Sequence, residues 1–183
     1  MFKYLILPAL MAGAAYAKTD CDRFRDYGIV DGKLGDLQIY GYIYIVCKAL
    51  GNGKHDNADA LIEETIRSEC NFGYTKDRSK EYGEGLGQFD RIAFDDVKNR
   101  VKENTKVRLK KMGIDLDQAR YEDLRKSPLL SIVFIRLKYL LVPSSIPLTR
   151  EGRWQYYKKW YNSYAGAATM AHFMAAQQGN HYV

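Results

Sequence analysis

The segment from Ser127 to Pro143, SPLLSIVFIRLKYLLVP, constrains the fold of this chain more than any other feature of the sequence. Ser127 can cap a helix, Pro128 fits the first helical position, and Pro143 marks the end of the helix. Between the two prolines, the residues are apolar on nearly every side of such a helix. A helix of this kind belongs in a core, where other elements surround it. We therefore predict a central buried helix and a mainly α fold around it.

The stretch 37–50, LQIYGYIYIVCKAL, fits two structures. Its β-branched and aromatic residues suit a strand, while its apolar spacing suits a buried helix. Caps, stop residues and periodicity predict the other helices: one within 59–74 after Asp56 or Asn57, one or two exposed helices in 90–112, one after Thr149 that carries 154–164, and a last one in 166–179 that Gly179 ends. No repeat or linker divides the chain, so we expect one domain.

The start of the chain has the composition of a secretory signal. Lys3 supplies a positive charge, residues 4–16 are uncharged, and a small-x-small cleavage site ends at Ala17. The uncharged run is shorter than the roughly 20 residues that span a bilayer. We expect a signal peptide in 1–17, a mature domain in 18–183, a periplasmic or secreted localisation, and no integral membrane segment in the mature chain.

The formal net charge of +6 at pH 7 falls to +5 when Lys3 leaves with the signal peptide. A positive excess favours anionic surroundings such as the cell wall, lipid head groups or nucleic acid. Export disfavours the last of these, so we expect no nucleic-acid partner. Seven of the cations lie between positions 98 and 111, where such a run is most often a solvated face and, alternatively, a wall-binding one: Lys98, Arg100, Lys102, Lys106, Arg108, Lys110 and Lys111.

Cysteine and histidine usage limits the redox and metal chemistry of the chain. The residues concerned are Cys21, Cys47 and Cys70, and His55, His172 and His181. In an oxidising compartment, three cysteines form at most one intramolecular disulfide, and the spacing leaves open which two would pair. No Cys-x-x-Cys motif is present and the histidines lack metal-ligand spacing. We expect neither a metal nor a cofactor.

Glu69 differs from the other glutamates of the helix in 59–74. The apolar positions of this helix recur at spacings of three and four and form one face: Ala58, Leu61, Ile62, Thr65 and Ile66. Glu69 continues this face, whereas we expect Glu63 and Glu64 to point to solvent. A carboxyl at the edge of a core is poorly solvated when charged, so its pKa rises and it can act as a general acid. Alternatively, Glu69 ends the helix and turns to water.

The stretch 82–90, YGEGLGQFD, has three glycines within five positions. Such a density permits a close approach of the backbone to a ligand or a turn with positive φ, and Gln88 adds an amide with donors and an acceptor. A plain turn is the alternative interpretation. The stretch does not follow a strand with dinucleotide-binding or P-loop spacing, so it does not predict a phosphate site.

Four motifs, in order along the chain, resemble the soluble lytic transglycosylases and their goose-type lysozyme relatives. They are IRSECNF at 66–72, similar to Ile-Arg-x-Glu-Ser-x-Phe; GLGQF at 85–89, similar to Gly-Leu-Met-Gln; SPLLSI to KYLL at 127–141, similar to the Asp-Pro-x-x-Asn-Ile to Tyr-Leu helix; and WYNSYAGAA at 160–168, similar to Ala-Tyr-Asn-Ala-Gly-x-Gly-Ala. The resemblance implies a single lysozyme-like domain, mainly α within the α+β lysozyme type, with a catalytic cleft for peptidoglycan glycan strands.

Carried over by position, the resemblance makes Glu69 the catalytic residue. It implies substrate-binding or groove-lining roles for Cys70, Gly85, Gln88, Tyr161 and Asn162, with Tyr161 near the Glu69 carboxyl. The chain departs from the family pattern at three positions, since Cys70 replaces a serine, Gly87 replaces a methionine and Tyr164 replaces a glycine. A thiol forms weaker hydrogen bonds than a hydroxyl, and we expect Gly87 to open space.

The resemblance also implies a mechanism with one carboxylate. Glu69 protonates the leaving oxygen of the β-1,4 bond between N-acetylmuramic acid and N-acetylglucosamine, while the N-acetyl group stabilises the positive centre. The ionised Glu69 then takes the proton of the C6 hydroxyl, and the product is a 1,6-anhydro end. Most glycosidases need a second carboxylate, but substrate-assisted enzymes do not.

Other interpretations stay open. Glu84 or Asp90 can be the second carboxylate of a hydrolytic lysozyme, or both can be solvent-facing loop charges. A non-catalytic wall-binding assembly protein of a secretion system or phage agrees with the departures at Cys70 and Tyr164, and an exported nucleic-acid binder agrees with the basic and aromatic composition. Four aromatic residues are predicted to contribute partly to the core and partly to sugar stacking: Trp154, Tyr157, Trp160 and Tyr161.

Overall fold

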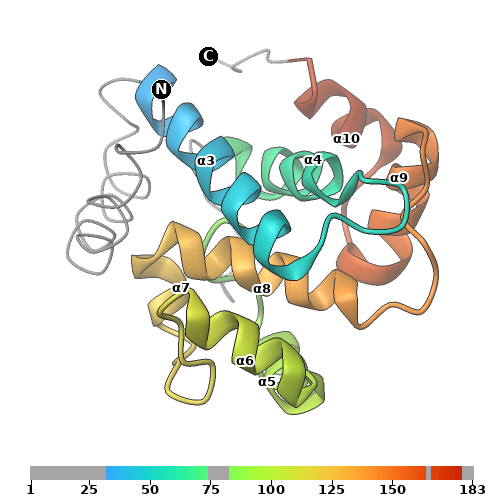
Figure 1. Ribbon diagram of the computed structural model, residues 1–183. Helices are drawn as coiled ribbons and strands as arrows, with labels where there is room; N and C mark the ends of the chain where they lie inside the picture. Colours follow the sequence, from blue (N-terminus) through green and yellow to red (C-terminus); the bar gives the residue numbers. More distant parts are fainter. Residues whose placement is uncertain (1–31, 74–82, 164–165, 179–183) are drawn as a thin grey trace, which may run out of the picture.

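The computed structural model describes residues 32–73, 83–163 and 166–178 (Figure 1). The expected signal peptide with its cleavage site near Ala17 lies outside these residues, and so do Cys21, Tyr164 and Gly179. Among the described residues, no helix combines the length and the apolar character that crossing a membrane requires.

The described chain is mainly helical, which confirms the predicted mainly α class. Its elements are α3 (Gly32–Leu50), α4 (Ala58–Cys70), the 3₁₀ turn η1 (Asn71–Gly73), α5 (Arg91–Arg100), α6 (Glu103–Lys111), α7 (Asp123–Lys126), α8 (Pro128–Leu140), α9 (Arg150–Tyr157), the π-helical turn η2 (Lys158–Asn162) and α10 (Met170–Ala176). The ambiguous stretch 37–50 is helical. In the described ranges, the one strand-like pairing is an isolated bridge between Glu84 and Phe89.

α8 is the central helix, with α3 and α4 on one side of it and α5 and α7 on the other (Figure 1). Ser127 caps it by accepting a hydrogen bond from the Leu130 amide at 3.1 Å, and Pro128 occupies its first position. Residues 130–137 are all buried. Arg136, a cation within this stretch, donates from Nε and Nη2 to the Gly51 carbonyl at 2.9 and 2.7 Å. The prediction of a central buried helix is therefore confirmed.

The N-cap residue of α4 is Asn57, one of the two predicted residues, but Asn52 supplies the side-chain hydrogen bond to the start of the helix. Asn57 occupies the N-cap position but makes no side-chain capping hydrogen bond. Its amide nitrogen donates instead to the Pro147 carbonyl at 2.8 Å, while Asn52 Oδ1 accepts from the Asp59 amide at 2.8 Å. The predicted N-cap position is therefore confirmed for Asn57, whereas its side chain contacts the loop at Pro147 and makes no capping hydrogen bond.

The predicted apolar face of α4 is fully buried. Ala58, Leu61, Ile62, Thr65 and Ile66 each have 0% of their surface exposed. The periodicity of the sequence therefore identifies the side of α4 that faces the core.

Glu64 is also buried, although we expected it to face solvent. Arg153 donates from Nε and Nη2 to the two oxygens of Glu64, each at 2.7 Å, and Arg150 adds a contact of 3.2 Å. This bidentate pair satisfies a carboxylate that has lost its water. The prediction is wrong because α9 packs against this side of α4. Glu63 is half-buried and pairs with Arg67 at 3.0 Å.

Replacement of Glu64 by glutamine is expected to lower the free energy of unfolding by roughly 3–5 kcal/mol, because the Arg153 guanidinium would lose its counter-charge in the interior. The matched control is Glu63→Gln, since a more exposed pair contributes about 0–1 kcal/mol. Urea denaturation followed by circular dichroism measures both values. Equal losses in the two variants would contradict the distinction drawn between them.

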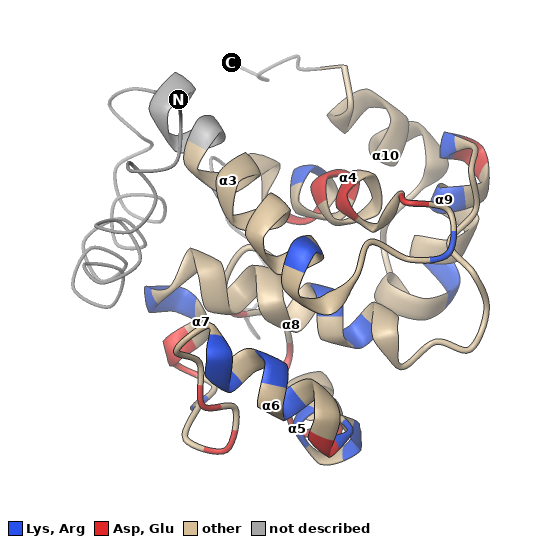
Figure 2. Ribbon diagram, viewed as in Figure 1, with Lys and Arg blue, Asp and Glu red and all other residues tan. Residues whose placement is uncertain are grey.

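Residues 90–112 form two helices, α5 and α6, which lie across α8 from α4 (Figure 1). Asp90 caps α5 by accepting a hydrogen bond from the Ala93 amide at 2.6 Å. Lys and Arg residues occur along both helices (Figure 2). The prediction of one or two exposed helices in this range is thus confirmed, and there are two.

The C-terminal helices begin at threonine caps. Thr149 Oγ1 accepts a hydrogen bond from the Gly152 amide at 3.1 Å at the start of α9, as predicted, and α9 continues directly into η2. α10 is shorter than the helix expected in 166–179. It begins after Thr169, whose Oγ1 accepts from the His172 amide at 3.2 Å.

Candidate active site

Glu69 lies in the last turn of α4, at the edge of the core. Its side chain is half-buried, and its Oε1 accepts a hydrogen bond from the Tyr157 hydroxyl at 2.7 Å. α4 ends one residue later because Asn71 adopts the left-handed conformation of a helix C-cap, at φ 45° and ψ 56°. Glu69 therefore faces a tyrosine of the neighbouring helix at the core edge and does not turn wholly to water.

Tyr157 and Tyr161 form a stacked pair beside Glu69. Their ring centroids are 5.9 Å apart and the rings are inclined by 18°. Tyr157 donates to Glu69, whereas the Tyr161 hydroxyl donates to the Gly87 carbonyl at 2.7 Å. Burial first, and the charge of Glu69 second, raise the pKa of both phenols. Both tyrosines therefore remain hydrogen-bond donors over the physiological pH range.

The Gly-rich stretch forms a tight turn against α8. Its ends pair through the Glu84 amide and the Phe89 carbonyl at 2.8 Å, and through the Phe89 amide and the Glu84 carbonyl at 3.1 Å. Gly85 has a φ of 70°, and a Cβ there would lie 2.6 Å from Ser131 Oγ. A Cβ on Gly87 would lie 2.3 Å from the Tyr161 hydroxyl oxygen. The glycines thus permit a close approach to the protein itself, and Gly87 opens no space.

Cys70 and Gln88 hold this turn in place. Cys70 is buried, and its Sγ donates to the Leu86 carbonyl at 3.3 Å, which connects α4 to the turn. Gln88 has a φ of 45° and donates from Nε2 to the Gly85 carbonyl at 2.8 Å, within the turn. In this structure, both side chains therefore organise the surroundings of the acid.

Asn162 lies at the end of η2, and Lys158 links it to the chain that follows. Its Oδ1 accepts from Lys158 Nζ at 3.0 Å, and the same nitrogen donates to the Gly166 carbonyl at 2.6 Å. The neighbouring Asn162 amide counteracts part of the rise of the Tyr157 pKa. π-helical turns are rare and frequently occur at functional sites.

Both candidates for a second carboxylate, Glu84 and Asp90, already form hydrogen bonds within the protein. Glu84 is buried and forms a bidentate ion pair with Arg125, in which Arg125 Nε donates to Oε2 at 2.9 Å and Nη2 donates to Oε1. The expectation that Glu84 faces solvent is therefore wrong. Asp90 is exposed, as expected, and its carboxylate caps α5.

Lys138 is a site residue that the sequence alone did not indicate. Its Nζ donates to the Tyr161 carbonyl at 3.0 Å and lies 4.2 Å from the centroid of the Tyr161 ring. Burial lowers the pKa of Lys138, and the charges of Asp90 and Glu69 oppose this shift. The available signal was a single lysine in the apolar sequence of α8.

The four aromatic residues divide between the core and the surface, which confirms that part of the set is core, while the predicted sugar stacking stays a prediction. Tyr157 and Tyr161 are buried. Trp154 is half-buried against Phe173, with centroids 5.4 Å apart. Trp160 is 36% exposed, and Lys159 Nζ lies 4.5 Å from its ring centroid.

The described residues contain no group of three or more His, Cys, Asp or Glu side chains placed to hold a metal ion. Cys47 is a buried free cysteine, and burial raises the pKa of its thiol to about 12. His172 contacts the Ser68 carbonyl through Nε2 at 3.1 Å. The described histidines and cysteines are therefore not brought together into a metal centre.

Comparison with known proteins finds no match to this chain among family models, curated proteins or solved structures. Functional inference therefore depends on the residues and their geometry.

Replacement of Gly87 by alanine is expected to lower the free energy of unfolding by about 1–3 kcal/mol, because the new methyl group would collide with the Tyr161 hydroxyl and Ile135. The control is Gly41→Ala in α3, where a Cβ meets nothing within 4 Å and is expected to stabilise the helix by about 0.5–1 kcal/mol. Urea denaturation measures both changes. A stable Gly87→Ala protein would contradict the packing described here.

Proposed function

We propose that this protein is an exported peptidoglycan lytic transglycosylase with a lysozyme-like domain and a catalytic cleft. Its substrate would be the β-1,4 bond between N-acetylmuramic acid and N-acetylglucosamine in periplasmic or extracellular glycan strands. Glu69 acts first as a general acid and then as a general base, without a metal or cofactor. The observation that carries this proposal is the hydrogen bond from the Tyr157 hydroxyl to the half-buried Glu69 carboxyl.

The surroundings of Glu69 suit both steps of this reaction. Glu69 is half-buried at the core edge, so its carboxyl can contact both the protein and a bound glycan, and in its protonated form it can donate to the leaving oxygen. The hydrogen bond from Tyr157 stabilises the ionised form that results. That form then accepts the proton of the C6 hydroxyl, which closes the 1,6-anhydro ring. One carboxyl group thus serves as acid and as base.

The other nearby carboxylates favour this one-carboxylate mechanism over hydrolysis. Glu84 pairs with Arg125 through both oxygens, and Asp90 caps α5. A nucleophile or base must be able to reach the sugar or a water. Recruitment of either residue would break a contact that supports the turn or the helix.

Mass spectrometry of fragments released from purified peptidoglycan by the mature protein tests the proposal. Wild type is expected to release fragments with 1,6-anhydro ends, and Glu69→Gln is expected to release none while its circular dichroism and thermal unfolding stay unchanged. Substantial activity of Glu69→Gln would remove Glu69 from the catalytic role.

Two other results would each replace the proposal. Reducing ends would show hydrolysis and direct attention to Glu84 or Asp90. A wild-type protein that sediments with wall material but releases no fragments would be a non-catalytic wall-binding protein, such as an assembly factor of a secretion system or phage.

A second variant pair identifies the tyrosine that assists Glu69. Tyr157→Phe is expected to lower turnover about 10–100-fold, since a hydrogen bond to a charged group contributes about 1.5–3 kcal/mol. Tyr161→Phe removes the bond to Gly87 and is expected to affect stability, by about 1 kcal/mol, more than turnover. Steady-state release of soluble fragments compares the two. A larger loss of turnover in Tyr161→Phe would make Tyr161 the partner of the acid.

A further inference from the structure

A basic face on α6 has no role in the candidate active site. Residues 102–111 carry five cations, at Lys102, Lys106, Arg108, Lys110 and Lys111, and one carboxylate, at Glu103. In Figures 1 and 2, α8 lies between α6 and the acid-bearing helix α4. The basic face, defined here as Arg108, Lys110 and Lys111, therefore lies away from Glu69.

The cations of the basic face lack the ion pairs that neighbouring cations form. Nearby, Arg100 pairs with Asp96 at 2.9 Å and Lys106 with Asp117 at 2.6 Å. Arg108, Lys110 and Lys111 are exposed, and none of them forms an ion pair within the part of the chain that the structure describes. Their charge is therefore available to an external anionic partner.

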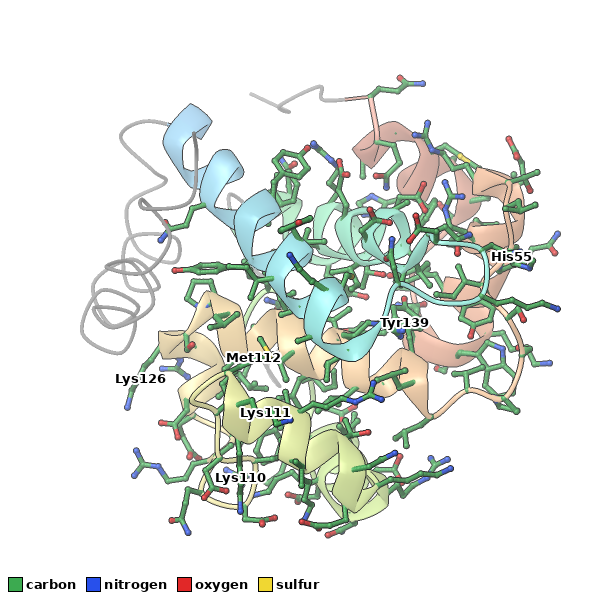
Figure 3. All side chains as sticks on the ribbon, in the orientation of Figure 1. His55, Lys110, Lys111, Met112, Lys126 and Tyr139 are labelled. Carbon is green, nitrogen blue, oxygen red and sulfur yellow. The ribbon has the colours of Figure 1, made fainter. Side chains whose placement is uncertain are left out.

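An exposed valine lies in the middle of these cations. Leu109 is fully buried and marks the inward side of α6. At about 100° per residue, Val107 and Lys111 lie opposite Leu109, with Arg108 and Lys110 on the flanks. Val107 is 46% exposed. Figure 3 shows Lys110 and Lys111 on one side of the molecule, together with Lys126 at the end of α7.

The cations near the end of α6 have a local explanation, and Val107 differs from the other exposed apolar side chains of the described residues in its position between cations. Positive side chains in the last turn of a helix interact favourably with its dipole. The helix dipole gives no reason for an apolar side chain to stand exposed between them. An exposed apolar side chain between cations can enter the headgroup layer of an anionic lipid surface while the cations contact the phosphates.

We propose that the basic face docks the protein on a bilayer containing anionic phospholipids. The headgroup phosphates would contact Arg108, Lys110 and Lys111, while Val107 enters the headgroup layer. A soluble phosphate polymer could satisfy the cations but would leave Val107 in water, so a lipid surface fits the complete face better. Docking through α6 leaves Glu69 on the other side of α8, and the proposal is independent of the proposed enzymatic function.

The strength of such docking should depend on charge and salt. Each basic residue near an anionic bilayer increases partitioning roughly five-fold. This attraction is screened over about 10 Å at 0.1 M salt. We therefore expect binding to anionic vesicles to weaken steeply as salt is added, and binding to neutral vesicles to be much weaker.

Vesicle flotation of the mature protein tests the proposal, with phosphatidylcholine vesicles compared with vesicles that also contain phosphatidylglycerol. Lys110→Glu combined with Lys111→Glu is expected to weaken binding to the anionic vesicles about 25-fold or more. The matched control is Lys48→Glu combined with Lys54→Glu, which changes net charge equally at two other exposed lysines. Val107→Ser should weaken binding without any change of charge. Circular dichroism confirms that each variant is folded.

Three outcomes would overturn the proposal. In the first, the wild-type protein does not float with the anionic vesicles. In the second, both double variants lose vesicle binding equally, which indicates an effect of net charge and not of this face. In the third, the Lys110 and Lys111 double variant binds vesicles normally but loses binding to purified wall material. Vesicle binding of Glu69→Gln keeps the two proposals separate, since docking predicts wild-type flotation whether or not Glu69 is catalytic.

Discussion

The enclosure of α8 is the constraint on which the other elements depend. Residues 130–137 are all buried, so water must be excluded on every side of this stretch. α3 and α4 cover one side, and α5 and α7 the other. Because Arg136 cannot leave this interior, the turn after α3 must bring the Gly51 carbonyl to its guanidinium. The arrangement of the surrounding helices follows from these requirements.

The candidate site uses the same packing. Three hydrogen bonds connect its parts: Cys70 to the Leu86 carbonyl, Tyr161 to the Gly87 carbonyl, and Lys138 to the Tyr161 carbonyl. They join α4, the Gly-rich turn, η2 and α8 around the Tyr157–Glu69 contact. The acid is therefore held by elements that are distant in sequence and packed against one core.

Local signals in the sequence predicted the local parts of this structure. Ser127 and Thr149 cap their helices as expected, and the periodicity of α4 identified its buried face. Expectations failed where a distant partner decides the outcome. Glu64 is buried because of an arginine 89 positions away, and Glu84 because of one 41 positions away.

The sequence predicted only part of the candidate site, again because distant residues decide the rest. The motif containing Glu69 marked a candidate acid at the edge of the core, and Glu69 is half-buried there. Which tyrosine donates to it depends on how η2 packs against α4 and the turn. The hydroxyl on Glu69 belongs to Tyr157, four positions before the tyrosine of the recognised motif. No single motif encodes that choice.

The π-helical turn η2 sets the number of residues between Tyr157 and the tyrosine that contacts the Gly87 carbonyl. A π-helix holds one more residue per hydrogen-bonded loop than an α-helix. The wider π-turn absorbs this extra residue locally, so a chain one residue shorter between Lys158 and Asn162 could close the turn as an α-helix and leave the residues after it in nearly the same orientation relative to α9. Tyr157 lies before the turn and Tyr161 within it, so a deletion between them would change the spacing of the two tyrosines in the sequence while the groups that they contact stay the same. Alignments of more distant sequences through this turn should therefore place gaps by the geometry of the two hydroxyls and not by residue identity alone.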